Sequence, residues 1–205
     1  MAARPGKDKK FYAALTRASG KDKETRDRVA QQYGYVHDPD LSTGDIAVYA
    51  KPDKSHAVVS LAGTDFTNFK DIKADIGVVA GQVHNTQRYK ESEDATRKVL
   101  GKYGKNVTLS GYSLGGAVAD KLGQQMEMES VVFNPGSNPL LPTRKGSNTK
   151  VYSHNNDLVS KGYKGWNPRY FKKGWKGMGR ELLKDGARML LTGGHDLKED
   201  DMYEV

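Results

Sequence analysis

The stretch best suited to chemistry is Gly111-Tyr112-Ser113-Leu114-Gly115, in which a serine lies between two glycines at G-x-S-x-G spacing. A serine at such a turn can attack a carbonyl carbon once a base accepts its hydroxyl proton. Glycines suit the flanks because a sharp turn from strand to helix leaves little room for neighbouring side chains. The motif indicates acyl-transfer chemistry at Ser113. It is short, and a turn without a catalytic role would fit the same five residues.

The residues around this motif have the pattern that such a turn requires. Residues 107–109 form a β-branched and apolar run between Gly104 and Gly111, which is typical of a buried strand. From Leu114 onward, apolar residues recur at helical spacing. We therefore expect Ser113 at the N-terminus of a helix, where the helix dipole favours a developing oxyanion.

A nucleophilic serine needs a histidine base and a carboxylate that orients the histidine. In hydrolases with a G-x-S-x-G turn, the acid and then the histidine follow the serine along the chain. Of the five histidines, only His154 and His195 follow Ser113, and His195 has an acid candidate before it, Asp157, at the end of a predicted strand. The sequence thus favours Asp157 as acid and His195 as base. Local turn hydrogen bonds at Asp157 and a surface position for His195 are the alternatives.

The tetrahedral intermediate needs two hydrogen-bond donors for its oxyanion. One is the backbone amide after the nucleophile, which belongs to Leu114. The second is expected from the loop after an earlier strand, and Thr64 follows the predicted strand at residues 56–61. Thr64 is our candidate for this donor, although it could also be a simple turn residue or helix cap.

The remaining pattern alternates strands with helices, which predicts an α/β fold with a mostly parallel central sheet flanked by helices in one compact domain over residues 1–205. The expected helices cover residues 11–18, 23–33, 66–79, 86–103 and those after Leu114, and the first two are expected to be polar. The expected strands cover residues 45–50, 56–61, 107–109, 130–134 and 150–157, and residues 38–44 are expected to be a loop.

Four segments together resemble the class 3 lipases, the fungal-type branch of the α/β hydrolases. These segments are Thr108–Ala117, Ala62–Asp65 followed by Phe69–Asp75, Asn156–Val159 and Gly194–Leu197. The resemblance runs from about Asp45 to Leu197.

This resemblance implies an α/β-hydrolase fold, a lipase or phospholipase type of ester hydrolysis and no metal or other cofactor. It implies Ser113, Asp157 and His195 as the triad, Thr64 and Leu114 as the oxyanion hole, Gly111 and Gly115 as the glycines of the turn, and Asp75 as a structural aspartate. The sequence departs from the family at Ala62, where the usual residue is arginine, and it lacks the disulfides of secreted members. Compact members are found in large DNA viruses as well as in cells, so virion association is one possible location.

Composition limits the environment in which this chemistry would occur. The chain has 205 residues, a formal net charge of +8 and no cysteine. A basic chain suits an anionic partner, and the absence of cysteine excludes disulfides and a cysteine nucleophile. We recognise no signal peptide and no run of 18 apolar residues, and we expect the basic residues 1–10 to be flexible. Any membrane contact would be peripheral, and no protein partner is predicted.

Residues 161–188 form a basic aromatic segment between the predicted acid and base. It contains both tryptophans, Trp166 and Trp175, together with Lys172, Lys173 and Lys176. Aromatic rings and lysines are typical of a surface that docks on anionic lipid, so this segment is our candidate lid or membrane-docking surface. Binding of single-stranded nucleic acid is a less favoured interpretation, and a solvated loop with buried tryptophans is the third. A non-catalytic module that binds through this segment is the alternative to the enzyme.

Overall fold

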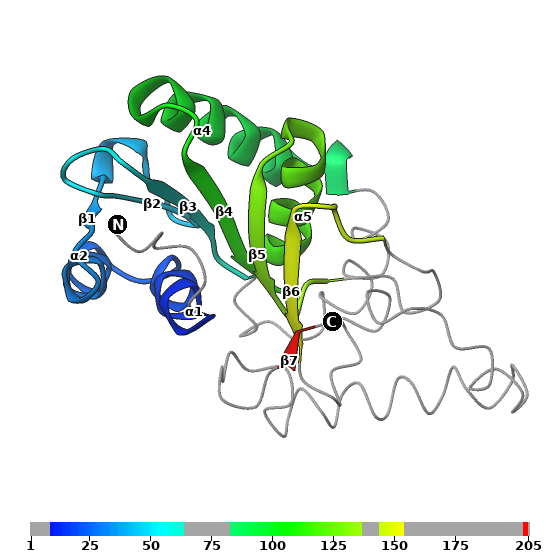
Figure 1. Cartoon of the computed structure of the whole chain (residues 1–205), viewed down its shortest axis with the longest axis horizontal. Helices are drawn as coiled ribbons and strands as arrows, with labels where there is room; N and C mark the ends of the chain where they lie inside the picture. Colours follow the sequence, from blue (N-terminus) through cyan, green and yellow to red (C-terminus); the bar gives the residue numbers. More distant parts are fainter. Residues whose placement is uncertain (1–8, 64–82, 137–143, 154–202, 205) are drawn as a thin grey trace, which may run out of the picture.

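The strands of the described residues form one sheet whose spatial order follows the chain order. The computed structural model describes residues 9–63, 83–136, 144–153 and 203–204 (Figure 1). The 7-stranded sheet has the order β1-β2-β3-β4-β5-β6-β7. Its strands are β1 (Val36–His37), β2 (Ile46–Ala50), β3 (Ala57–Leu61), β4 (Val107–Tyr112), β5 (Glu129–Phe133), β6 (Thr149–Ser153) and β7 (Tyr203–Glu204). The central strands β3 to β6 are parallel, and the flanking pairs are antiparallel. The expected α/β fold, with a mostly parallel central sheet in one domain, is confirmed.

Polar residues begin the described helices and glycine ends one of them. The helices are α1 (Lys9–Ala18), α2 (Lys23–Gln32), α4 (Gln87–Tyr103) and α5 (Leu114–Met126), with short 3-10 turns η1 (Pro39–Leu41) and η2 (Val83–Asn85). The side chain of Asp22 accepts a hydrogen bond from the Thr25 amide at 2.8 Å and so caps α2. Thr86 caps α4 in the same way. Gly104, with φ of 79°, follows the last residue of α4.

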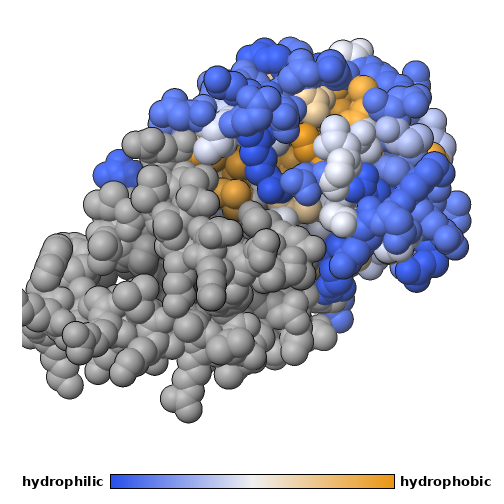
Figure 2. Space-filling model, turned by 180° about the vertical axis from the view of Figure 1, so that it is seen from behind, coloured by the Kyte–Doolittle hydropathy of each residue, from blue (hydrophilic) through white to orange (hydrophobic). Residues whose placement is uncertain are grey.

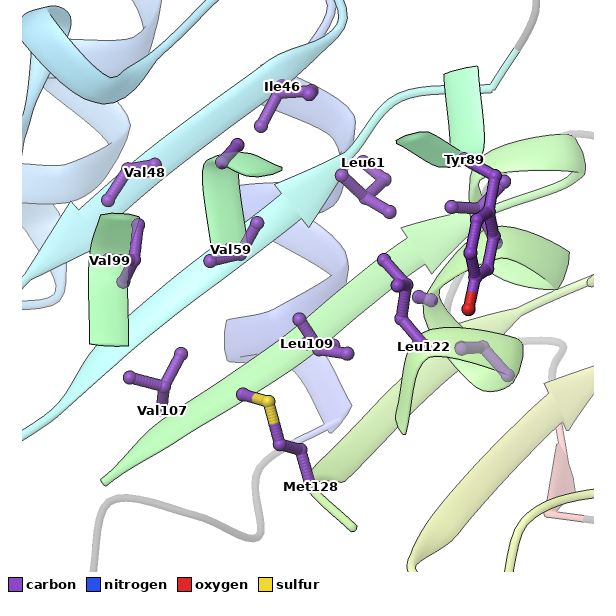
Figure 3. Close-up of a cluster of buried hydrophobic side chains, with 14 of the residues drawn as sticks. Ile46, Val48, Val59, Leu61, Tyr89, Val99, Val107, Leu109, Leu122 and Met128 are labelled. Atoms are coloured by element: carbon purple, nitrogen blue, oxygen red, sulfur yellow. The ribbon is translucent and has the colours of Figure 1, made fainter. Parts of the chain in front are cut away.

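The sheet separates two hydrophobic clusters. Because each connection from β3 to β4 and from β4 to β5 steps in the same direction, right-handed crossovers place α4 and α5 on one face. The other face is covered by α1 and α2 (Figure 1). Successive side chains of a strand point to opposite faces of the sheet. Val59 and Leu109 therefore pack toward α4 and α5, whereas Val58 packs toward α1. Figure 3 shows the first cluster, with Val99 of α4 and Leu122 of α5 against the sheet.

Several expected boundaries need correction. Lys9 and Lys10, assigned to the flexible N-terminal segment, belong to α1. We expected α1 to be polar, but six of its residues are buried, because one side of this short helix packs on the sheet. The expected loop at 38–44 contains η1, and the edge strands β1 and β7 were not predicted. A strand of two residues has no periodicity to recognise, and its position comes from pairing with β2 or β6.

On the face shown in Figure 2, the described surface is mostly hydrophilic and has a strip of hydrophobic residues. Within the described residues, no helix has both the length and the apolar character needed to cross a bilayer.

Buried polar contacts join α1, and the residue before β1, to the strands β3 and β4. The hydroxyl of Tyr35 lies 2.8 Å from His56 Nδ1, and His56 Nε2 lies 2.9 Å from Thr108 Oγ1. Nearby, Thr16 Oγ1 lies 2.6 Å from Ser110 Oγ. His56 is 5% exposed. Burial, and secondarily the charge of Lys51, lowers the pKa of His56 to about 4. This histidine is therefore neutral in the folded protein at neutral pH.

Because the pKa of His56 is lowered in the folded protein, we expect the free energy of unfolding to decrease at acid pH. Unfolded chains protonate this histidine below its ordinary pKa of 6.5, whereas the folded protein does not until about pH 4. The stabilisation present above pH 6.5 is therefore lost as pH falls toward 4, by about 2 kcal/mol at pH 5. Urea unfolding at pH 7 and pH 5 should show this loss in the wild type and a much smaller one in His56→Gln. Equal losses in the two proteins would contradict the prediction.

Candidate active site

Ser113 lies between the last residue of β4 and the first residue of α5. Its backbone has φ of 53° and ψ of −122°, a conformation that non-glycine residues rarely adopt. A serine before a helix normally has extended backbone and uses its hydroxyl to cap the helix. Ser113 makes no such side-chain cap to α5. With this backbone conformation, the Ser113 hydroxyl does not cap the helix, as a serine at this position usually does.

Three backbone hydrogen bonds hold Ser113 in this conformation. Its amide donates to the carbonyl of Phe133 at 3.0 Å, which joins the turn to the end of β5. Its carbonyl accepts from Ala117 at 3.0 Å and from Gly136 at 2.8 Å. Conformations of this kind cost about 1–3 kcal/mol and persist only where the surroundings impose them. The turn is therefore held by the end of β5, by Gly136 after that strand and by the first turn of α5.

The glycines of the motif allow α5 to lie directly on the ends of β3 and β4. A Cβ atom at Gly111 would be 2.3 Å from the carbonyl oxygen of Gly115. A Cβ atom at Gly115 would be 2.3 Å from the carbonyl oxygen of Ala62 and 2.5 Å from that of Leu61. All these contacts are with backbone, which cannot rotate away. Glycine is therefore required at both positions for steric reasons.

The position of Ser113 suits the stabilisation of negative charge. The carboxyl ends of the parallel strands β4, β5 and β6 meet at this edge of the sheet, where ligands bind in α/β folds. Leu114 begins α5, so its amide belongs to the positive end of the helix dipole. Ser113 is fully buried. Dipoles act more strongly in such a place, because little water screens them.

The other predicted site residues lie outside the described residues. These are Thr64, Asp75, Asp157, His195, Trp166, Lys172, Lys173, Trp175 and Lys176. The geometry therefore brings together Ser113, Leu114 and the two glycines, and the triad partners stay predictions. In the described ranges, no group of three acidic or histidine side chains is placed to hold a metal ion.

Two of the three described histidines lie too far from Ser113 to be its base. His56 precedes β3 at its N-terminal end, where Ala57 pairs with Val107 at the start of β4. β4 spans six residues, so this position is roughly 16 Å from the Ser113 end. His37 is at the same end, since it pairs with Tyr49, which pairs with Val58. The third, His84, is an exposed residue of η2, which contacts α5.

A second arrangement of serine, histidine and aspartate was not foreseen from the sequence. Ser42 Oγ lies 3.1 Å from His37 Nε2, and His37 Nδ1 lies 2.8 Å from Asp27 Oδ1. The order of these contacts is that of a catalytic triad. The sequence holds little signal for it, because Asp27 comes from α2 and meets His37 only when α2 packs beside β1.

The hydrogen bonds of Ser42 identify this second arrangement as structural. Its hydroxyl donates to the carbonyl of Asp38 at 2.6 Å and accepts from the amide of Val48 at 2.9 Å. A hydroxyl has one proton, so Ser42 cannot also give that proton to His37. Its backbone, with φ of −98° and ψ of 151°, is ordinary extended chain. Ser42 thus holds η1 and its loop against β2.

The steric role of Gly115 predicts opposite results for two glycine-to-alanine variants. Gly115→Ala should lose at least about 3 kcal/mol of stability or fail to fold, because its Cβ would overlap backbone oxygen atoms. Gly101→Ala is the matched control: Gly101 lies inside α4, and its Cβ would have no heavy atom within 4 Å. It should gain about 0.5–1 kcal/mol from helix propensity. Thermal and urea unfolding would measure both, and a Gly115→Ala variant as stable as wild type would refute the packing argument.

Comparison with known proteins returns one family. Residues 63–160 match a family described as "Uncharacterised protein family (UPF0227)". The match covers just under half of the chain and includes the β4-Ser113-α5 turn, Thr64 and Asp157, but not His195. No curated protein and no solved structure matches the chain. The α/β fold and this match are compatible with a hydrolase, and they give no support to the narrower resemblance to class 3 lipases.

Proposed function

We propose that this protein is a serine carboxylester hydrolase that cleaves acyl esters of lipids, with Ser113 as nucleophile. The observation that carries the proposal is the strained backbone of Ser113 between β4 and α5, with glycines in backbone contact on either side. Strain of this kind is concentrated at functional sites. The G-x-S-x-G sequence in a strand-turn-helix context is the usual setting of a nucleophilic serine.

In the proposed mechanism, His195 accepts the Ser113 proton as the serine oxygen attacks the ester carbonyl carbon. Asp157 orients the histidine and stabilises its positive charge. The amides of Leu114 and Thr64 bind the oxyanion of the tetrahedral intermediate. Collapse of this intermediate releases the alcohol, which takes the proton from His195, and leaves an acyl-serine. Water, activated by the same histidine, then releases the carboxylic acid.

The burial of Ser113 bears on the substrate. Since Ser113 is fully buried, the proposal includes an opening movement of the site that admits the ester to the hydroxyl. An enzyme of lipid esters could undergo this movement when it docks on a lipid surface. The basic aromatic segment at 161–188 supplies residues suited to docking, Trp166 and Trp175 among them. This supports lipids over small water-soluble esters as the substrate class.

The competing hypothesis is a non-catalytic protein of the same fold that binds an anionic surface. It would retain the fold and the basic segment but form no acyl-enzyme. Covalent labelling separates the two hypotheses, because only an activated serine reacts rapidly with a fluorophosphonate.

In the presence of phosphatidylserine vesicles, we expect a fluorophosphonate probe to label the wild type, with labelling and p-nitrophenyl ester hydrolysis lost in Ser113→Ala. Ser42→Ala is the matched control, since it breaks the second serine-histidine-aspartate arrangement; it should retain both activities. His195→Ala should lower hydrolysis by at least about a thousandfold, and His84→Ala should not. Labelling that persists in Ser113→Ala, or a folded wild type without labelling, would overturn the proposal.

The docking part of the proposal predicts a charge-dependent membrane affinity. Changing Lys172, Lys173 and Lys176 to glutamine should weaken binding to phosphatidylserine vesicles roughly 100-fold, at about 1 kcal/mol for each lysine. The control changes Lys90, Lys105 and Lys121, which are exposed lysines on the described surface, and removes the same net charge. Vesicle sedimentation would measure both, and equal weakening in the two variants would show that only net charge matters.

A further inference from the structure

The backbone of Ala62, just after β3, is held by two charged residues from other elements. The Nη2 atom of Arg88, the second residue of α4, donates a hydrogen bond to the carbonyl oxygen of Ala62. The Nη1 atom of Arg88 lies 3.4 Å from the carboxylate of Asp45. The amide of Ala62 donates to the backbone carbonyl of Asp45 at 2.9 Å. Arg88, Asp45 and Ala62 thus form a closed ring of contacts.

The same carbonyl is in contact with the turn that carries Ser113. A Cβ atom at Gly115 would be 2.3 Å from the Ala62 oxygen, so this oxygen lies against the first turn of α5. The next residue, Gly63, also lies against this turn. A Cβ atom added at Gly63 would be 2.7 Å from the ring of Tyr112 and 3.4 Å from the Cβ of Ser113. A displacement of the Ala62 peptide would therefore change its distance from Ser113.

The side chain of Ala62 has little room around it. A Cβ at Gly20 would be 3.2 Å from the Cβ of Ala62, which shows that the chain passes close to this methyl group. Ala62 itself is buried. The cation that donates a hydrogen bond to the Ala62 carbonyl comes instead from another element, α4.

Arg88 is suited to this position by its charge and burial. Its side chain is 17% exposed, and burial lowers its pKa from the ordinary value while Asp45 and Glu91 raise it. A guanidinium remains protonated in proteins. A charged donor to a carbonyl forms a hydrogen bond about twice as strong as a neutral one. Lysine could not replace it fully, since one ammonium lacks the planar pair of donors.

We propose that Arg88 is a positioning residue for the oxyanion hole. It holds the Ala62–Gly63 end of β3 against the Ser113 turn, and so fixes the chain that leads directly to Thr64. This inference rests on the proposed function, in which the Thr64 amide is the second oxyanion donor. A small displacement of that amide weakens binding of the transition state more than binding of the ester, because the oxyanion forms only in the transition state.

The test compares Arg88→Met and Arg88→Lys with two control variants of α4. Arg97→Met removes an exposed arginine that pairs with Glu93 on the same helix. Val99→Ala removes buried methyl groups from α4 and destabilises the protein without touching Ala62. Hydrolysis of p-nitrophenyl butyrate gives kcat and KM, and inhibition by an alkyl boronic acid gives the affinity for a tetrahedral adduct. Hydrogen exchange reports the amides of Ala62 and Gly63.

We expect Arg88→Met to lower kcat and boronic acid affinity together by roughly 10- to 100-fold, with KM changed less than twofold. Arg88→Lys should recover part of this loss. Exchange at Ala62 and Gly63 should accelerate more in Arg88→Met than in Arg88→Lys or Val99→Ala. Val99→Ala should lose at least as much thermal stability as Arg88→Met and still keep the wild-type kcat.

Three results would overturn the inference. If the wild type is active and Arg88→Met keeps its kcat, the positioning role fails and the proposed function stands. If Val99→Ala loses as much kcat as Arg88→Met, Arg88 contributes only stability. If exchange at Ala62 and Gly63 is unchanged in Arg88→Met, Arg88 does not hold the strand end. A wild type that neither hydrolyses esters nor reacts with the fluorophosphonate would overturn the proposed function and this role with it.

Discussion

Backbone contact between α5 and the carboxyl ends of β3 and β4 is the constraint on which the candidate site depends. A helix can approach a sheet this closely only where both sides lack side chains, as at Gly111 and Gly115. Ser113 lies at this contact and takes a strained conformation that three backbone hydrogen bonds maintain. The nucleophile candidate is thus positioned by the packing of whole elements.

The two ends of the sheet differ in how they satisfy buried polar groups. At the N-terminal end of β3 and β4, His56 and Thr108 bond to each other and to residues that α1 and β1 bring to the sheet. Both ring nitrogens of His56 lie within hydrogen-bond distance of a hydroxyl, so this end of the sheet has a structural role. At the carboxyl end, Ser113 has a strained backbone and stands before the first amides of α5, which mark the positive end of the helix. Chemistry is therefore expected at the carboxyl end.

Much of the fold could be predicted, because its central elements have strong periodicity. The strands of the β2-β3 hairpin and the helix α4 are where the pattern placed them, to within one or two residues. The two-residue edge strands could not be predicted, since pairing alone defines them. Within the mostly charged first half of α4, Tyr89 and Ala95 are buried in the first hydrophobic cluster, which the pattern did not reveal. Of the candidate site, the strand and helix around Ser113 are confirmed as elements, and the catalytic roles stay predictions.

The sequence by itself singled out Ser113 as the candidate nucleophile, since its G-x-S-x-G motif stands between a predicted strand and a predicted helix. It also restricted the acid and base through chain order. Only the tertiary structure decided that Ser113 has a positive φ, that Arg88 reaches Ala62, and that Ser42, His37 and Asp27 meet. The physical reason is the range of the interactions. The spacing of apolar residues predicts single helices and strands. The Ser113 conformation and the Arg88 and His37 contacts depend on segments that meet only when the helices pack on the sheet.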